Sequence, residues 1–195
     1  MPPALPQAEF ANLHFVTPQL AIGGDMSAED DDLSIQQFAE IGSLGITHIV
    51  DVRIEWSDAE TFARHAPHVR YLHHSLDDDG QRVPAEWFEH AVGWVEAAWA
   101  EDPSAVVLTH CHMGINRGPS LGFAVLLALG WDPVEAITAL RGVRAEANVW
   151  YAADALTWHQ QRTGIDARTA ARQHADLEAW RTANPLDVRR FLRGR

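Results

Sequence analysis

The strongest constraint on the fold lies between residues 105 and 129, where two apolar runs flank a short loop. Residues 105–108 (Ala-Val-Val-Leu) have the character of a buried strand. Residues 121–129 are apolar on every side, and a helix of that kind belongs in the interior of a protein. The sequence therefore predicts a strand, a tight loop and a buried helix, with the loop at the N-terminal end of that helix.

This loop is suited to bind an anion. The first amides of a helix have no partner within it, and the helix dipole adds roughly half a positive charge at this end. Between Cys111 and Arg117 the chain can curl so that successive N–H groups and the guanidinium converge on one tetrahedral oxyanion. Gly114 is free to adopt positive φ, and Pro119 suits the first helical turn. We expect the anion to be held by His112, Met113, Gly114, Ile115, Asn116 and Arg117.

Cys111 stands at the mouth of this loop, where the amides and Arg117 favour the thiolate over the thiol. Two other interpretations compete with this one. His110, Cys111 and His112 could ligate a metal, but alternate strand residues point to opposite faces, and no Cys-x-x-Cys or His-x-x-x-His pair supports such a site. A buried, inert cysteine ahead of a core helix is also common. We expect the anion loop, without a metal.

The residues His110, Cys111, Gly114 and Arg117 match the pattern His-Cys-x-x-Gly-x-x-Arg. This pattern resembles the signature of the cysteine-dependent protein tyrosine phosphatase superfamily, and the chain most resembles its compact dual-specificity branch. The resemblance implies that Cys111 attacks phosphorus, that Arg117 and the loop amides hold the equatorial oxygens, and that water later hydrolyses the cysteinyl phosphate. It also implies that His110 supports the loop and that no cofactor is needed.

One position departs from the family pattern. The family usually has Ser or Thr directly after the arginine, where the hydroxyl supports the thiolate as it leaves in the second step, but here that residue is Gly118. Ser120 lies two residues further on and is a candidate for this role. Without such a hydroxyl, we expect the intermediate to turn over slowly.

A general acid must protonate the leaving oxygen, and a carboxylic acid on a neighbouring loop is the usual donor. The resemblance points to an aspartate ahead of the cysteine, and Asp78 lies 33 residues before Cys111. Asp77 and Asp79 adjoin it, and both stay open as alternatives because the sequence does not fix a one-residue register. We expect Asp78 to act as the acid and later as the base.

The rest of the chain alternates strands with helices, which indicates an α/β fold. We expect a central mixed sheet of four to five strands flanked by helices, a tyrosine phosphatase-like three-layer sandwich. Ser34, Asp132 and Asn148 are expected to cap helices, and Arg144 and Asn148 resemble a structural Arg-x-x-x-Asn link of the family. Further strands are predicted at residues 13–16, 20–22, 46–52 and 69–74, and further helices at 34–44, from 58, from 84, at 134–140 and at 149–162.

The resemblance covers roughly residues 10–162 and leaves the C-terminal part unexplained. Gly164 breaks the chain, and Asp166 can start a polar helix whose anchoring side chains are Leu177 and Trp180. We expect residues 1–162 to form the catalytic domain and residues 163–195 to form a helical extension of the same domain.

The formal net charge is −12, and all 15 basic residues are arginine. Such a chain repels nucleic acid and anionic membranes, so we expect neither as a partner. The single cysteine, the lack of a basic and apolar leader in the first six residues, and the short apolar runs are typical of a cytoplasmic protein. The sequence carries no signal for the oligomeric state.

Together these features predict hydrolysis of a phosphate monoester through a cysteinyl-phosphate intermediate. Phosphotyrosine in proteins is the leading substrate, followed by phosphoserine or phosphothreonine and by small phosphate esters. Two alternatives stay open. One is a phosphate-binding module with little or no turnover, motivated by Gly118. The other is a sulfurtransferase, whose cysteine carries a persulfide and needs no aspartic acid.

Overall fold

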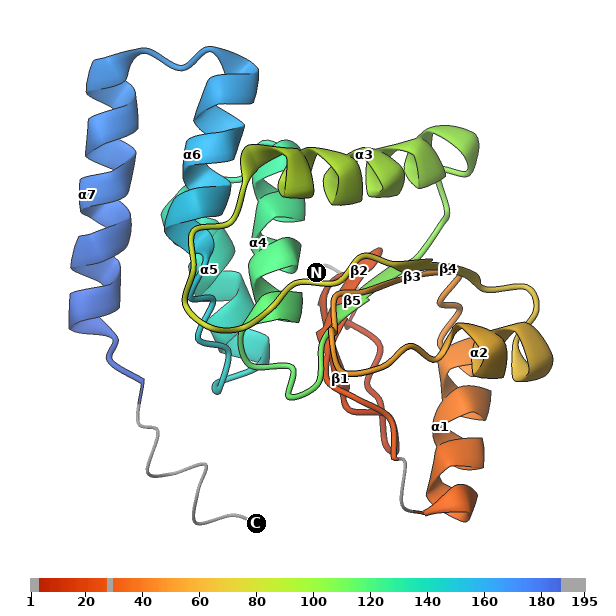
Figure 1. Ribbon diagram of the computed structural model, residues 1–195. Helices are drawn as coiled ribbons and strands as arrows, with labels where there is room; N and C mark the ends of the chain where they lie inside the picture. Colours follow the sequence, from red (N-terminus) through yellow and green to blue (C-terminus); the bar gives the residue numbers. More distant parts are fainter. Residues whose placement is uncertain (1–3, 28–29, 187–195) are drawn as a thin grey trace.

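The centre of the fold is a five-stranded sheet (Figure 1). The structure, a computed structural model, describes residues 4–27 and 30–186 of the 195-residue chain. The spatial order of the strands is β1, β2, β5, β3, β4; β1 is antiparallel to β2, and all other neighbours pair in parallel. The mixed sheet predicted from the sequence is confirmed. Its strands are β1 (Leu13–Thr17), β2 (Leu20–Gly23), β3 (His48–Asp51), β4 (Arg70–His73) and β5 (Val107–His110).

Helices cover both faces of the sheet and complete the predicted three-layer sandwich (Figure 1). Because successive strand residues point to opposite faces, Ala21 belongs to the buried apolar cluster that contains Phe38, whereas its neighbour Ile22 belongs to the cluster that contains Phe123. Two apolar clusters, one on each face, therefore hold the layers together. One face carries α1 (Asp31–Ser43) and α2 (Ala59–His65); the other carries α3 (Ala85–Glu101), α4 (Arg117–Ala128), α5 (Pro133–Val143) and α6 (Ala152–Thr163).

The parallel strands end at one edge of the sheet, and this edge brings three loops together. In the strand register His110 of β5 lies beside Gly23 of β2 and Asp51 of β3. The carboxyl edge of parallel strands is the usual place for a site in an open α/β sheet. The loops at residues 24–27, 52–58 and 111–116 are therefore neighbours, although they are far apart in sequence.

Helix α4 is buried on all sides, as predicted, from Arg117 to Leu127. Gly122 lets α4 lie directly on the sheet, because a Cβ at this position would come within 2.7 Å of Cγ2 of Ile22. The N-terminal end of α4 is thereby held rigidly at the carboxyl edge of β5. No helix in residues 4–27 and 30–186 is long and apolar enough to cross a membrane.

The predicted helix starts are partly correct. Asp132 caps α5 as expected, accepting hydrogen bonds from the N–H groups of the first helical turn. Helix α1 begins earlier than predicted, because Asp30 rather than Ser34 is its cap and accepts a hydrogen bond from the N–H of Leu33. The local sequence offers several acidic and hydroxyl residues in a row, and the one that meets a free N–H becomes the cap.

The prediction that Asn148 caps a helix starting at residue 149 is wrong. The N–H of Asn148 donates to the carbonyl of Ile115 (2.7 Å), and Val149 adopts φ +52°, in the left-handed region. A β-branched residue in this conformation cannot continue a right-handed helix and is strained. Helix α6 therefore begins only at Ala152.

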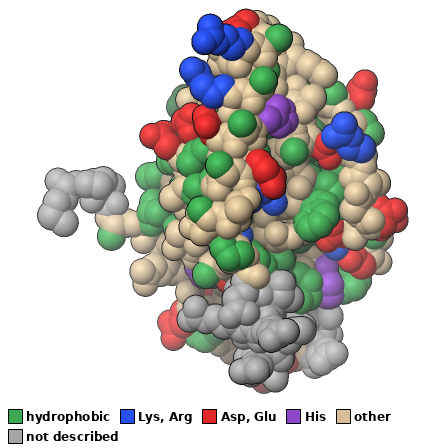
Figure 2. Space-filling model, turned by 90° about the vertical axis from the view of Figure 1, so that its left-hand side faces the viewer, with side chains coloured by type: hydrophobic (Ala, Val, Ile, Leu, Met, Phe, Trp, Pro, Cys, Tyr) green, Lys and Arg blue, Asp and Glu red, His purple; other side chains and the backbone are tan. Residues whose placement is uncertain are grey.

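A helix, α7 (Ala167–Ala183), is present in the predicted extension and packs against α5 and α6 (Figure 1). The predicted anchors are the ones used: Leu177 is buried, and the guanidinium of Arg141 lies 5.3 Å from the ring centre of Trp180. Arg181 donates a hydrogen bond to the carbonyl of Val149. On the face in Figure 2, charged and hydrophobic side chains are interspersed among the described residues. Residues 187–195 of the predicted extension lie outside the described part.

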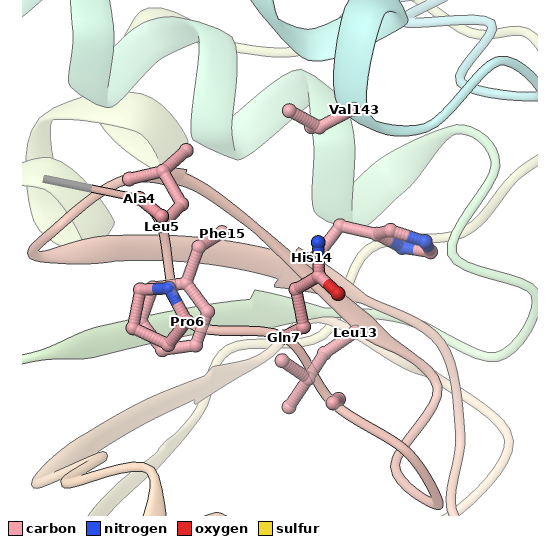
Figure 3. Close-up of a pocket in the computed structure, with 9 residues that line it drawn as sticks. Ala4, Leu5, Pro6, Gln7, Leu13, His14, Phe15 and Val143 are labelled. Carbon is pink, nitrogen blue, oxygen red and sulfur yellow. The ribbon is translucent and has the colours of Figure 1, made fainter.

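A pocket opens between residues 4–8 and β1, with Val143 of α5 on its other side (Figure 3). His14 is the one ionisable side chain among the residues that line it. None of these lining residues belongs to the loops at the carboxyl edge of the parallel strands, so the candidate active site is a separate place in the fold.

Candidate active site

The Cys111 loop, residues 111–116, joins β5 to α4 and exposes its peptide N–H groups to one side. In a planar trans peptide unit, the N–H points away from the C=O. Because the carbonyls of residues 112–115 are all bound from outside, the N–H groups of residues 113–116 face the interior of the loop. Outside groups donate to these four carbonyls: Asp25 N–H to His112 (2.9 Å), Arg144 to Met113 (3.1 Å) and Gly114 (2.6 Å), and Asn148 N–H to Ile115 (2.7 Å).

Gly114 and Arg144 maintain this curl. Gly114 adopts φ +65°, the left-handed conformation predicted for it, and a Cβ here would come within 2.6 Å of the backbone of Gly23 and Gly24. Only glycine fits such a position. Arg144 is buried beneath the loop and holds it through Nε and one terminal nitrogen, so the structural role expected for this arginine is confirmed.

Arg117 is buried at the start of α4 and is hydrogen-bonded on one side to the carboxylate of Glu55. Its two terminal nitrogens donate to the Glu55 carboxylate at 3.0 and 2.6 Å, and one of them also donates to the carbonyl of Leu76 (3.1 Å). Its Nε is buried, has no hydrogen-bond partner among the described residues, and lies 3.5 Å from Oδ2 of Asp78. A bidentate pair fixes the plane of a guanidinium, so Glu55 orients the remaining donor of Arg117.

Sequence reasoning did not identify Glu55. Its hydrogen bonds to Arg117 are the main cause that lowers the pKa of this carboxyl to about 2, so it is ionised at any working pH. One signal was available: Glu55 lies in the loop that follows β3, four residues after the strand ends at Asp51, and residues after parallel strands gather at the carboxyl edge.

Of the three candidate acids, the fold places Asp78 next to Arg117. Oδ1 of Asp78 accepts hydrogen bonds from Nδ2 of Asn116 (2.5 Å) and from the hydroxyl of Tyr151 (3.0 Å). The carboxylates of its neighbours have local structural partners: Asp77 accepts from the N–H of Asp78 (2.8 Å), and Asp79 from that of Gln81 (3.1 Å). Asp78 is therefore the one of the three whose carboxylate contacts Asn116, Arg117 and Tyr151, and its role as the acid stays a prediction.

A buried ionic group, the Arg53 cluster, supports these loops and was also missed by the sequence analysis. The Arg53 guanidinium is fully buried and pairs with Asp25, Asp51 and Asp58, and Tyr71 donates a hydrogen bond to Asp51. These carboxylates hold the pKa of Arg53 above its usual value despite burial. A buried arginine with its charge matched in this way fixes the chain on both sides of residue 55.

Two exposed tryptophans flank the Cys111 loop. The ring of Trp56 lies edge-on to His112, with 5.2 Å between ring centres, and Trp150 donates its backbone N–H to Oδ1 of Asn116 (2.6 Å). Large exposed aromatic side chains beside a polar site are typical of a surface that receives a partner or substrate. The mouth of the site, the surface around the Cys111 loop, is therefore bordered by apolar rings.

His110 is fully buried at the end of β5, with Nε2 at 3.8 Å from Oδ1 of Asp51. Desolvation by burial lowers its pKa to about 4, so the ring is neutral near pH 7. His112 points elsewhere, with Nδ1 at 3.1 Å from Asp25. In the described ranges, no three His, Cys, Asp or Glu side chains are grouped so that they could hold a metal ion.

The buried histidines predict a loss of stability in mild acid. The unfolded chain takes up a proton on His110 near pH 6.5, but the folded protein does so only near pH 4. Between these values the unfolded state binds more protons, so the free energy of unfolding falls as the pH is lowered through this window. His110 alone accounts for roughly 3 kcal/mol at pH 4, at about 1.4 kcal/mol per unit. Burial also lowers the pKa of four further histidines: His14, His48, His74 and His159.

Urea unfolding at pH 7.5, 6.0 and 5.0 measures this loss. A His110→Gln variant, which cannot take up the proton, should show a shallower dependence on pH. Asp25 has the opposite effect on the free energy of unfolding, because burial raises the pKa of its carboxyl and the folded state then binds more protons than the unfolded state in acid. This one carboxyl opposes the five histidines whose pKa is lowered. A free energy of unfolding that is constant from pH 7.5 to 5.0 would contradict the prediction.

Gly118 is packed against the strand that precedes the loop, which explains the departure from the family pattern. A Cβ at this position would lie 2.9 Å from Cα of His110 and 3.0 Å from N of Cys111. Ser120 is buried one turn further on, and its Oγ accepts a hydrogen bond from the N–H of Tyr151 (3.2 Å). The described hydrogen bonds of Ser120 thus connect it to the start of α6, and its support of the Cys111 thiolate stays a prediction.

Gly118→Ser, which would restore the family residue, is expected to lower the stability by about 1–3 kcal/mol, the usual cost of overpacking. The loop would have to move away from α4, so we also expect slower phosphate release. Gly93→Ala in α3 is a matched control, because a Cβ there meets nothing within 4 Å. A Gly118→Ser protein that is as stable as the wild type and turns over faster would show that the close packing is unimportant.

No protein-family model and no curated protein matches the sequence. Solved structures do match: human DUSP28 has a TM-score of 0.63 and 19% identity over 82% of this chain and 99% of its own. Tk-PTP in its active form has a TM-score of 0.61 and 20% identity over 77% and 97% of the two chains. PTPMT1 in complex with PI(5)P has a TM-score of 0.62 and 15% identity over 78% and 97%. The chain is therefore similar in fold to phosphatases of the tyrosine and dual-specificity type, and the predicted resemblance to that fold is confirmed.

Proposed function

We propose that this protein hydrolyses phosphate monoesters through a cysteinyl-phosphate intermediate. The observation that carries the proposal is Nε of Arg117, which is buried at the end of the Cys111 loop without a hydrogen-bond partner among the described residues and marks a point 3.5 Å from Oδ2 of Asp78, beside the inward N–H groups of residues 113–116. A tetrahedral dianion at this point would meet positive partial charges on one side and a carboxyl group on the other. This is the arrangement that stabilises phosphoryl transfer and its leaving group.

The reaction would proceed in two steps. In the first, the Cys111 thiolate forms an S–P bond while the P–O bond to the leaving group breaks, and Asp78 gives its proton to the leaving oxygen. In the second, Asp78 takes a proton from a water molecule whose oxygen attacks phosphorus. The S–P bond then breaks and releases inorganic phosphate and the thiolate. Arg117 and the loop amides would hold the equatorial oxygens throughout.

Phosphotyrosine in a protein is the substrate that fits the mouth best. Trp56 and Trp150 offer apolar surface to an aromatic ring or to apolar flanking residues. The carboxylates of Asp77 and Asp79 and the absence of lysine from the whole chain disfavour a polyanion. PTPMT1 is similar in fold and was crystallised with PI(5)P, but an inositide headgroup carries several negative charges, which the acidic side chains of residues 77–79 would repel.

The test is the time course of phosphate release near pH 6 from a phosphotyrosine peptide, a phosphoserine peptide and an inositide. Steady release that is fastest from the phosphotyrosine peptide would support the proposal. Faster release from the inositide would overturn the assignment of substrate while leaving phosphatase chemistry in place.

A binding module with little turnover is the second candidate, and Gly118 is the observation that favours it. Without a hydroxyl after Arg117, the cysteinyl phosphate would be hydrolysed slowly, so the dephosphorylated peptide would appear in one burst of about one equivalent and then stall, while inorganic phosphate would appear only slowly and without a burst. Phosphopeptide binding without any release would favour a pure binding module. Sulfurtransferase chemistry would instead label Cys111 from thiosulfate and would be unaffected by Asp78→Ala.

A further inference from the structure

Tyr151 touches the loop that carries Asp78 at four places. Its ring is buried in the apolar cluster beside α4, at the N-terminal cap of α6, and only its hydroxyl reaches the acid loop, residues 75–82. The four neighbours of that hydroxyl are Oδ1 of Asp78 (3.0 Å), Oε1 of Gln81 (3.1 Å), the carbonyl of Asp77 (3.5 Å) and the N–H of Gly80 (3.4 Å).

The Tyr151 hydroxyl has one proton to donate and three possible acceptors, namely Asp78, Gln81 and the carbonyl of Asp77. The strongest acceptor therefore decides where the proton points. Burial raises the pKa of Tyr151 to about 12, and the phenol therefore keeps its proton at any working pH. An ionised carboxylate is a stronger acceptor than an amide or peptide carbonyl. The Tyr151 proton is thus directed to Asp78, while the hydroxyl oxygen accepts from the N–H of Gly80.

Asn116 supplies a second donor to the same oxygen. Its Oδ1 accepts the backbone N–H of Trp150 (2.6 Å), and this contact fixes the orientation of the amide. Nδ2 of Asn116 therefore faces Oδ1 of Asp78 (2.5 Å) as a donor. With two donors on Oδ1, a proton carried by Asp78 is placed on Oδ2, and Oδ2 is the oxygen that lies 3.5 Å from Nε of Arg117.

We propose that Tyr151 is a positioning residue for the general acid: its hydroxyl, together with Asn116, holds Asp78 so that the transferable proton sits on the oxygen facing the substrate. This inference rests on the proposed phosphatase function and adds a residue from outside the Cys111 loop and the acid loop. The hydroxyl also connects the acid loop to the segment after Val149 that leads into α6, so it holds the loop over the site.

Tyr151→Phe tests the proposal, because it removes the hydroxyl and keeps the ring that fills the core. The readout is kcat/KM, which reports formation of the cysteinyl phosphate, for phenyl phosphate and p-nitrophenyl phosphate. Phenolate needs a proton to leave, whereas p-nitrophenolate needs little help. We expect a loss of about tenfold with phenyl phosphate and less than about twofold with p-nitrophenyl phosphate, with the inhibition constant of inorganic phosphate unchanged.

Two further variants separate positioning from general damage. Tyr71→Phe, at the only other tyrosine, removes a hydroxyl of the Arg53 cluster and should affect both substrates by the same factor. In an Asp78→Asn background, Tyr151→Phe should cause no additional loss, because the group it positions is gone. Equal losses with both substrates, or a full additional loss in the double variant, would overturn the proposal.

Hydrogen exchange of residues 76–82 provides a readout that does not depend on activity. Tyr151→Phe should speed exchange in this segment, where Gly80 N–H loses its acceptor, and leave exchange in α3 unchanged. Unchanged exchange in residues 76–82 would overturn the proposal even in an active enzyme. Absence of phosphate release by the wild type would instead refute the proposed function, and the exchange experiment would still decide whether Tyr151 holds the loop.

Discussion

Cys111→Ser is expected to reduce phosphate release by at least about 10⁴-fold while the protein still binds a phosphotyrosine peptide. The serine hydroxyl is not ionised near neutral pH and is a far weaker nucleophile than a thiolate. Cys111 is buried, and serine is slightly smaller, so the loop, its carbonyl contacts to Arg144 and the Arg117 clamp should remain. Phosphate release and calorimetric peptide binding, measured on the same preparation, give the two halves of this result.

Binding provides the control for this variant. If Cys111→Ser loses both release and binding, the loop has collapsed and the loss of rate says nothing about a nucleophile. If it retains release within about tenfold of the wild type, another group attacks phosphorus and the cysteinyl-phosphate route is refuted. Trapping of covalent phosphate on the wild-type protein, and its absence in the Cys111→Ser variant, would identify the intermediate directly.

Arg117→Lys is expected to lower kcat/KM by roughly 10³-fold, because a lysine cannot make the bidentate pair with Glu55 and at the same time direct a further, oriented donor at the phosphate. Glu55→Gln is the matched milder change: it keeps the size of the partner but removes its charge, and we expect a loss of about 10- to 100-fold. Both are measured with p-nitrophenyl phosphate, which depends least on the general acid.

The pH dependence of the Glu55 pair has a definite sign. Since the pKa of Glu55 is lowered to about 2, its contact with Arg117 persists on acidification through pH 4, where an ordinary glutamate would begin to take up a proton. Activity that falls below pH 5 therefore has to be traced to other groups.

An Arg117→Lys enzyme with wild-type kcat/KM would show that Arg117 does not clamp the transition state.

The parts of the fold that follow from local pattern were predictable. A buried strand, a loop with Gly114 and a buried helix are encoded within 25 consecutive residues, and the alternation of strands and helices gave the three layers. The family resemblance pointed to Asp78 by its spacing from Cys111, whereas the different contacts of Asp78, Asp77 and Asp79 are visible only in the fold. The carboxylates of Asp77 and Asp79 bind backbone N–H groups of their own turn.

The remaining parts of the site depend on contacts between distant residues. Glu55 meets Arg117 across 62 positions, and Tyr151 meets Asp78 across 73. No local periodicity encodes such pairs, because the order of the strands in the sheet decides which loops become neighbours. The position of Arg53 among three carboxylates was hidden for the same reason, although an arginine directly after a buried strand needs partners of opposite charge.

Strain at Val149 links helix α7 to the candidate active site. A β-branched residue in the left-handed region costs of order 1–3 kcal/mol, which neighbouring contacts have to offset. One of those contacts is the hydrogen bond from Arg181 of α7. The residues that follow the strained position are Trp150, which orients Asn116, and Tyr151, which holds Asp78. The structural unit around the Cys111 loop therefore extends beyond residue 163, and a shortened version ending there would lack the Arg181 contact that supports Val149 and, through Tyr151, the position of Asp78.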